Sequence, residues 1–184
     1  MLVTPSTIGT TCGAPSTGYV VQLYLLDAQD VKYIYEPTDD DMMCGGIVVT
    51  PGSKLVELPI KYKTCTYQEG QNTNNDGLGF QVTIGLSYSA PNNVDVMGWA
   101  NANKKRRWVA IFKTATGEVL LAGDAKNGLR LNTGRTGQER GVLGIGLSGV
   151  FWHSMWMLPT IDLEELFGGP RFVSTGFSSG FYTN

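Results

Sequence analysis

The strictest pattern in the sequence is an unbroken alternation over residues 78–88, LGFQVTIGLSY. A period of two places alternate side chains on opposite faces of an extended strand, so this segment predicts a half-buried β-strand about 36 Å long, at about 3.3 Å per residue. The inner face carries Leu78, Phe80, Val82, Ile84, Leu86 and Tyr88. The outer face carries Gly79, Gln81, Thr83, Gly85 and Ser87.

A second alternating run lies just before this strand. Apolar residues occupy the even positions from Val56 to Tyr62, with charged residues between them, and the turn-rich stretch 69–77 follows. The Asn-Asn-Asp-Gly sequence within that stretch favours a tight turn between two strands. Residues 54–88 therefore predict a long antiparallel hairpin whose turn lies in 69–77.

The outer face of 78–88 is small and polar but uncharged. A strand that faces solvent usually carries Lys, Glu or Arg, which also discourage pairing with other strand edges. The strand predicted over 142–152 repeats the pattern, with Gly144, Gly146 and Ser148 opposite large apolar residues. Because small residues let another backbone approach closely, we predict that both faces lie at a subunit interface or line a narrow lumen.

The other elements complete a mainly β chain. Residues 18–27 are apolar on both faces and predict a strand buried on both sides. Further strands are expected at 31–36, 107–114, 118–123 and 127–133, a short helix at about 92–103, and loops at 37–46 and 133–141. The predicted fold is an antiparallel β-sandwich or barrel with one flanking helix. It occupies residues 18–158, between an N-terminal arm at 1–17 and a C-terminal arm at 159–184.

Composition narrows the function classes. Charged residues make up 16% of the chain and Gly 24 of 184, which suits a surface covered by neighbours as well as an ordinary glycine-rich β protein. The net charge of −2 does not indicate general binding to nucleic acid. Neither a signal peptide nor a membrane-spanning run is expected. The chain has three cysteines, Cys12, Cys44 and Cys65, and no CxxC pair. An odd number without such a pair predicts neither a disulfide framework nor a zinc site. We therefore expect synthesis in a reducing cytosol.

No residue constellation predicts catalysis, a metal or a cofactor. His153 is the sole histidine and lies in the bulky run FWHSMWM, where a packing role is the more common one. Gly144, Gly146 and Gly149 match GxGxxG, but that motif requires a helix to begin at its glycines, and a strand is expected here. The acidic run at 39–41 lacks the spacing of a calcium loop.

One basic cluster and four tryptophans leave other binding functions open. The basic cluster consists of Lys104, Lys105, Arg106 and Arg107. One interpretation is a contact with DNA or with an acidic partner. The other is a charged helix end, which the helix dipole favours. The tryptophans at 99, 108, 152 and 156 would serve as stacking platforms if exposed. A carbohydrate-binding or host-adhesion β-sandwich is therefore the first alternative function. The second is an enzyme, which would require His153 or clustered acidic residues in a pocket.

The order of these segments resembles a known class of proteins. The likeness covers about 12–151: the GYVVQLYLLD strand, the hairpin KYKTCTYQEG…NNDGLGFQVTIGLSY, a short helix, and RRWVAIFKTATGEVLLAGDAKNGLRLNTGRTGQERGVLGIGLSG. It is similar to small virion proteins of tailed phages that infect Bacteroidetes-type bacteria and, more loosely, to tail-tube and head–tail connector proteins. The C-terminal aromatic run and arm depart from that pattern.

The resemblance implies a structural, non-enzymatic virion protein that assembles in the host cytoplasm. Its long hairpin would pair with those of neighbouring copies to form a ring or tube, and its arms would lock neighbours together. A nearly neutral lumen would let phage DNA pass with few phosphate contacts. The expected partners are other copies of the chain and other virion proteins.

Overall fold

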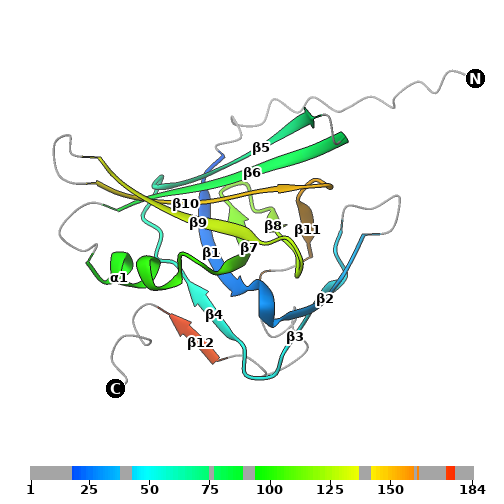
Figure 1. Cartoon of the computed structure of the whole chain (residues 1–184), viewed down its shortest axis with the longest axis horizontal. Helices are drawn as coiled ribbons and strands as arrows, with labels where there is room; N and C mark the ends of the chain where they lie inside the picture. The colour runs from blue at the N-terminus through cyan, green and yellow to red at the C-terminus, as the bar shows by residue number, and fades with distance from the viewer. Residues whose placement is uncertain are drawn as a thin grey trace, which may run out of the picture.

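The computed structural model describes residues 18–37, 43–74, 77–88, 94–136, 142–159, 161 and 173–176. This part of the chain is mainly β, as predicted, with one α-helix, α1 (Val94–Asn103), near its expected position (Figure 1). A 3₁₀ turn spans Ala28–Asp30. The strands are β1 (Val20–Asp27), β2 (Val31–Tyr35), β3 (Gly46–Val49), β4 (Lys54–Glu57), β5 (Cys65–Asn74), β6 (Gly77–Tyr88), β7 (Arg107–Thr114), β8 (Val119–Ala122), β9 (Leu129–Thr136), β10 (Val142–Phe151), β11 (Trp156–Leu158) and β12 (Val173–Gly176).

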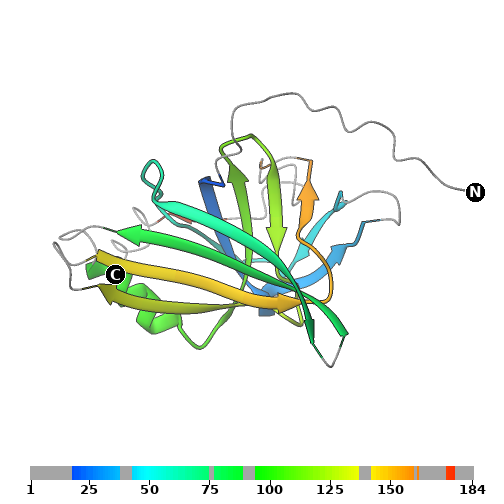
Figure 2. The same cartoon turned by 90° about the horizontal axis from the view of Figure 1, so that it is seen from above.

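Most strands belong to one folded sheet in the order β12-β4-β1-β7-β9-β10-β6-β5, and β8 and β11 extend it from β7. All its pairs are antiparallel except β12 with β4. Among the described strands, β12 and β5 end the order without pairing with each other, so the sheet is not closed into a barrel. The folded sheet is sandwich-like, which fits the first of the two predicted architectures, and β5, β6, β10 and β9 form one layer (Figure 2).

The central strands β1 and β7 are buried on both faces, as predicted for 18–27. On one side Leu23, Leu25 and Phe112 pack against the layer of β5, β6, β10 and β9. On the other side Leu26 and Ile111 pack against the two-stranded sheet of β2 and β3 and against β11. The described residues thus form two hydrophobic clusters, and β1 and β7 separate them.

The face assignment at the start of β1 needs a correction. Strict alternation would place Val21 with Leu23 on one buried face and Val20 on the other. The β1–β7 register instead shifts between Val20 and Gln22, as at a β-bulge. Val20 consequently joins Leu23 in the core, and Val21 is 44% exposed.

The predicted long hairpin is present, but its first strand and its turn lie elsewhere than expected. The stretch from Val56 is not the first arm, because β4 ends at Glu57 and pairs with β1. A turn around Lys63, whose φ of 61° is left-handed, then redirects the chain, and Tyr62 is 85% exposed. The first arm is β5, which pairs with β6 from Cys65 onward.

The expected turn and loop regions are also shorter than predicted. The ladder between β5 and β6 continues to Asn74, so most of 69–77 is strand, and residues 75–76 lie outside the described residues. Likewise β9 continues to Thr136 into the predicted loop 133–141. Polar, Gly-rich sequence indicated turns here, but cross-strand pairing overrides that preference. Of the predicted arms, 1–17 is not described, and Val173–Gly176 pairs with β4 of the same chain.

Candidate subunit interface

The two small-residue faces predicted from separate parts of the sequence form one surface. In the β10–β6 ladder, Gly144 lies opposite Ser87, Gly146 opposite Gly85, and Ser148 opposite Thr83. All of these residues are exposed or half-buried, as are Gly79 and Gln81 nearer the hairpin tip. We call this surface the small-residue face: Gly79, Gln81, Thr83, Gly85, Ser87, Gly144, Gly146 and Ser148.

The neighbouring strands extend the small-residue face in register. One row across the layer runs from Thr66 on β5 through Gly85 and Gly146 to Asn132 on β9. A shallow groove of about 670 Å³ follows these rows, and its one charged lining residue is Lys63 at the rim. This groove is therefore nearly neutral, whereas Arg107 and Arg130 line a second groove beside Gln81 and Ser148 at the other end of the face.

The glycines of the small-residue face are not required by the chain's own packing. A Cβ built at Gly85, Gly144 or Gly146 would meet its first neighbour at 3.7–3.9 Å, which is ordinary van der Waals contact. None of the three has the positive φ that would demand glycine. Glycine inside a strand costs about 0.5–1 kcal/mol relative to alanine, so the fold alone gives no reason for these residues.

Two other glycines differ: Gly128, just before β9, and Gly149 on β10. A Cβ at Gly128 would lie 2.9 Å from the Cβ of Arg107 and 3.0 Å from the backbone nitrogen of Trp108. At Gly149 it would lie 2.7 Å from the Phe151 ring. These two positions require glycine because neighbouring atoms of the same chain occupy the space.

The outer edge of β5 offers backbone groups for pairing. The amide of Ser87 donates to the carbonyl of Thr64, just before β5. Because backbone hydrogen bonds in an antiparallel pair involve every second residue, the even-numbered residues of β5 form the hydrogen bonds to β6. The odd residues therefore point their N–H and C=O groups outward. Tyr67 uses its outward amide to donate to the carbonyl of Gly18, and beyond it no described strand pairs with this edge.

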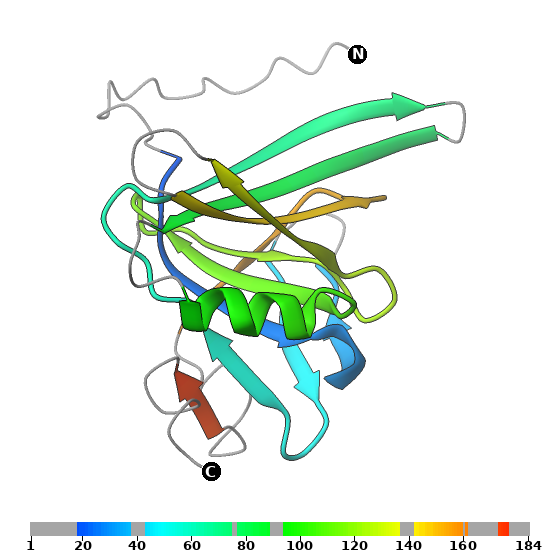
Figure 3. The ribbon, with the colours of Figure 1, turned by 60° about the vertical axis from the view of Figure 1, so that its left-hand side comes forward.

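The side chains of β5 do little to protect that edge. Its one acidic residue, Glu69, is directed to the segment after β10, where it accepts from the Met155 amide at 2.7 Å and the Ser154 hydroxyl at 3.1 Å. The strand has no Lys or Pro, the residues that commonly block edge pairing. Figure 3 shows the hairpin of β5 and β6 extending beyond the other strands.

The opposite edge of the same layer lacks a paired strand over part of its length, and α1 contacts the same strand, β9. Strand β9 pairs with β10 along most of its length, but with β7 only at Leu129 and Arg130. From Leu131 onward no described strand pairs with its other side. The layer thus presents two unpaired strand edges, one on β5 and one on β9.

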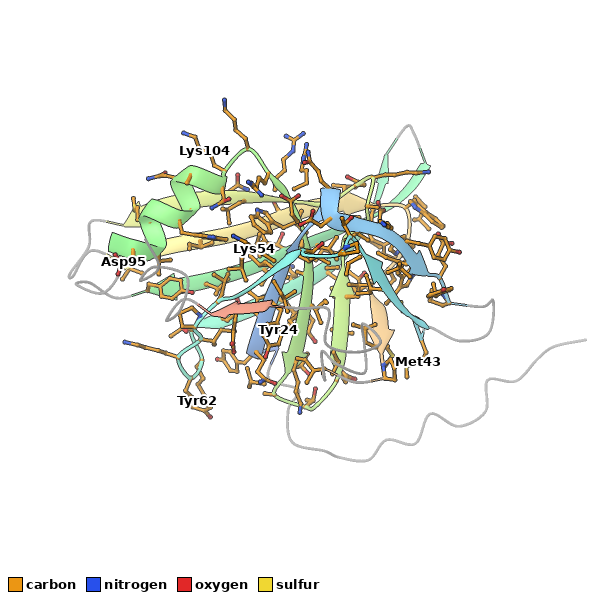
Figure 4. The ribbon with its side chains drawn as sticks, turned by 90° about the horizontal axis from the view of Figure 1, so that it is seen from below. Tyr24, Met43, Lys54, Tyr62, Asp95 and Lys104 are labelled. Carbon is orange, nitrogen blue, oxygen red and sulfur yellow. The ribbon has the colours of Figure 1, made fainter. Side chains whose placement is uncertain are left out.

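The basic cluster lies at the C-terminal end of α1, where the helix dipole favours positive charge. Arg106 forms an ion pair with Asp27 at 2.7 Å, and Asp27 also accepts from the amide of Gln29. Lys104, Lys105 and Arg107 are exposed, and Lys104 projects outward in Figure 4. One of the four predicted contact residues therefore has a role within the fold.

The four tryptophans are mostly used in packing. Trp108 is 3% exposed and packs against Trp99, with ring centroids 5.5 Å apart. Trp156 is 6% exposed and stacks on His153, whereas Trp152 is 66% exposed. One of the four predicted platforms is thus open to a ligand.

Burial changes the acid–base properties of groups beneath the small-residue face. Burial raises the pKa of the Cys65 thiol to about 12. The pKa of the Tyr88 hydroxyl is also raised, mainly by burial and further by Cys65 nearby. Both groups therefore stay protonated at neutral pH, and neither acts as a nucleophile or a base there.

Within the described ranges, no group of three or more His, Cys, Asp or Glu side chains is arranged to hold a metal ion. The acidic run at 39–41 and Cys12 lie outside those ranges. Gly144, Gly146 and Gly149 lie on β10, a strand, so the match to GxGxxG does not open a helix.

The structure contains no helix, in the ranges it describes, with the length and hydropathy needed to cross a membrane. Comparisons with models of protein families, with curated proteins and with solved structures found no match to this chain.

Proposed function

We propose that this chain is a structural, non-enzymatic subunit that assembles with copies of itself into a ring or tube, as in the tail or head–tail connector of a tailed phage. The observation that carries the proposal is the unpaired outer edge of β5, on a hairpin that extends beyond the body. An exposed edge of this length is a template for pairing with another chain. Proteins that remain monomeric usually protect such an edge, and β5 lacks the usual protecting residues.

The mode of assembly follows from the two edges of one layer. The β5 edge of one subunit would pair with the β9 edge of the next, so that four strands from each subunit build one continuous sheet. This contact joins two different surfaces, and a head-to-tail contact closes into a ring when the rotation allows it. Backbone hydrogen bonds would supply affinity, as in other cases of strand addition.

The small-residue face has a place in this assembly. It lies on the same layer, so in a closed ring it would line the lumen or contact a stacked ring. Its glycines, which the fold does not require, would allow a neighbouring backbone to approach closely. The groove around Gly85 and Gly146 has one charged lining residue, so phage DNA would pass it with few phosphate contacts. Residues 1–17 and the other parts of 159–184 are proposed to contact neighbouring subunits or other virion proteins.

Edge pairing is tested by the substitution Gln71→Pro, with Gln71→Ala as the matched control. Gln71 is exposed, and its amide points to the outer edge, so proline removes an outward donor without breaking the ladder to β6. Light scattering after size exclusion and negative-stain imaging should show rings or tubes for the wild type and for Gln71→Ala. The proline variant should remain monomeric with an unchanged melting temperature.

Two results would overturn the proposal. One is a wild-type protein that stays monomeric up to about 1 mM, the range at which even weak contacts form. The other is a proline variant that assembles as readily as the alanine variant. The second result would show that edge pairing is not the mode of assembly. The substitution Gly146→Arg would then test whether the small-residue face forms the subunit contact.

A further inference from the structure

A pocket of about 270 Å³ lies where β2 approaches the segment after β10 and the loop between β8 and β9. Tyr33 and Trp152 line it and are 55% and 66% exposed, which is unusual for large aromatic side chains. We propose that this pocket binds a neutral saccharide, with Trp152 as the stacking platform. The inference does not rest on the proposed assembly, because neither the β5 edge nor the small-residue face forms the pocket.

The aromatic residues form a supported group. The His153 ring stacks on buried Trp156 with centroids 4.0 Å apart and an interplanar angle of 11°. Trp152 contacts the same His153 ring at 4.9 Å and 84°. Trp156 thus holds His153, which in turn contacts Trp152, while most of the Trp152 surface stays open. A pyranose ring has an apolar C–H face that packs on such an exposed indole.

The polar lining distinguishes between ligand classes. Lys32 and Lys126 line the pocket together with Glu36 and Asp124, so positive and negative side chains are balanced. The lysines disfavour a cationic ligand such as a quaternary ammonium group, which aromatic pockets otherwise bind well. The carboxylates disfavour a phosphate. Sugar hydroxyl groups donate and accept hydrogen bonds, and they suit a lining that offers both donors and acceptors.

His153 adds a specific hydrogen-bond acceptor. Its Nδ1 lies 2.6 Å from the carbonyl oxygen of Ser154, so in the neutral ring Nδ1–H donates there and Nε2 is left as an acceptor. Nε2 is buried and has no partner among the described residues. In the proposed complex a movement of the side chains around His153 exposes Nε2, and a sugar hydroxyl donates to it.

The test is saturation-transfer NMR on the full chain with glucose, galactose, mannose and N-acetylglucosamine, each with its linear disaccharide. At least one sugar should bind saturably with a Kd of about 0.1–10 mM. The substitutions Trp152→Ala and Tyr33→Ala should weaken binding about tenfold or more. His153→Phe, which keeps a flat ring but removes the acceptor, should weaken it less. Tyr62→Ala removes an exposed aromatic residue elsewhere and should leave binding unchanged.

The exposed positions of Trp152 and Tyr33 make these variants suitable, because neither substitution opens the core, and circular dichroism checks that each remains folded. The proposal is wrong if none of the named sugars binds at about 20 mM, which exceeds the expected range. It is also wrong if Trp152→Ala binds as tightly as the wild type, or if inorganic phosphate or tetramethylammonium binds at Trp152 in place of the sugars.

Discussion

The two faces of β6 and β10 differ in what determines their residues. On the inner face Val82, Ile84 and Leu147 have no exposed surface, and each fills space against β1, β7 or α1. On the outer face Gly85 and Gly146 have room for a larger side chain that the sequence does not use. Intrachain packing accounts for these three residues, whereas Leu78, which the alternation places on the same face near the hairpin tip, is 52% exposed. We propose that a contact beyond the folded subunit accounts for the outer face, and the following predictions test that difference.

The largest effect should come from adjacent residues on β6. Ile84→Ala removes a fully buried side chain and should lower the free energy of unfolding by about 2–5 kcal/mol. Thr83→Ala, one residue away on the outer face, should change it by less than about 0.5 kcal/mol. Urea denaturation at low protein concentration, where subunits are separate, measures both. A loss above about 1 kcal/mol for Thr83→Ala would show that the outer face contributes to the subunit's own stability.

The glycines give the next largest contrast. Gly128→Ala places a Cβ against the backbone of Trp108 and should destabilise the subunit by about 1–3 kcal/mol. Gly146→Ala meets no close atom and should leave stability unchanged or raise it by about 0.5–1 kcal/mol, because alanine loses less backbone entropy. The same Gly146 variant should assemble less well than the wild type. Thermal unfolding and light scattering on the two variants separate these effects.

The inner face was the more predictable part of the molecule. Alternation over 78–88 and 142–152 gave the right strands, and the two apolar faces of 18–27 gave the central position of β1. These predictions succeeded because burial of one face makes apolar residues alternate along a strand, and this alternation is visible within a single segment of the sequence. The bulge near Val20 was missed, since a shift in register depends on the partner strand β7 and leaves no mark in local alternation.

The outer face could be predicted only in part. Its residues were identified from the sequence. That they form one surface depends on the pairing of β6 with β10, which are far apart in the sequence. The extent of β5 was missed because its polar residues at 69–74 resemble a turn, and only the ladder to β6 makes them a strand. Trp152 was identified as a possible stacking platform, but its pocket was missed, because Tyr33 comes from β2, more than a hundred residues earlier in the chain.

Beneath the outer face, Cys65 predicts a loss of stability at alkaline pH. Its pKa is about 12 in the folded chain against 9.0 for an ordinary thiol. Above pH 9 the unfolded chain loses this proton while the folded chain keeps it, so stability falls as pH rises, by about 1.4 kcal/mol per pH unit. Urea denaturation from pH 8 to about 10 measures the slope. Cys65→Ala should remove this contribution, and an unchanged slope in that variant would show that the thiol ionises in the folded chain.

The smallest effect should come from the basic cluster, where one side chain turns inward and its neighbours do not. Arg106 pairs with nearly buried Asp27 but is itself 58% exposed, so Arg106→Ala should cost only about 0.2–1 kcal/mol. The loss should shrink further at about 1 M salt, which screens an exposed charge. Lys104→Ala, the matched control on the same exposed segment, should change stability by less than about 0.3 kcal/mol at either salt concentration. Equal losses for the two variants would mean that the ion pair contributes nothing, and Arg106 would then join Lys104 and Lys105 as a residue available to a partner or to DNA.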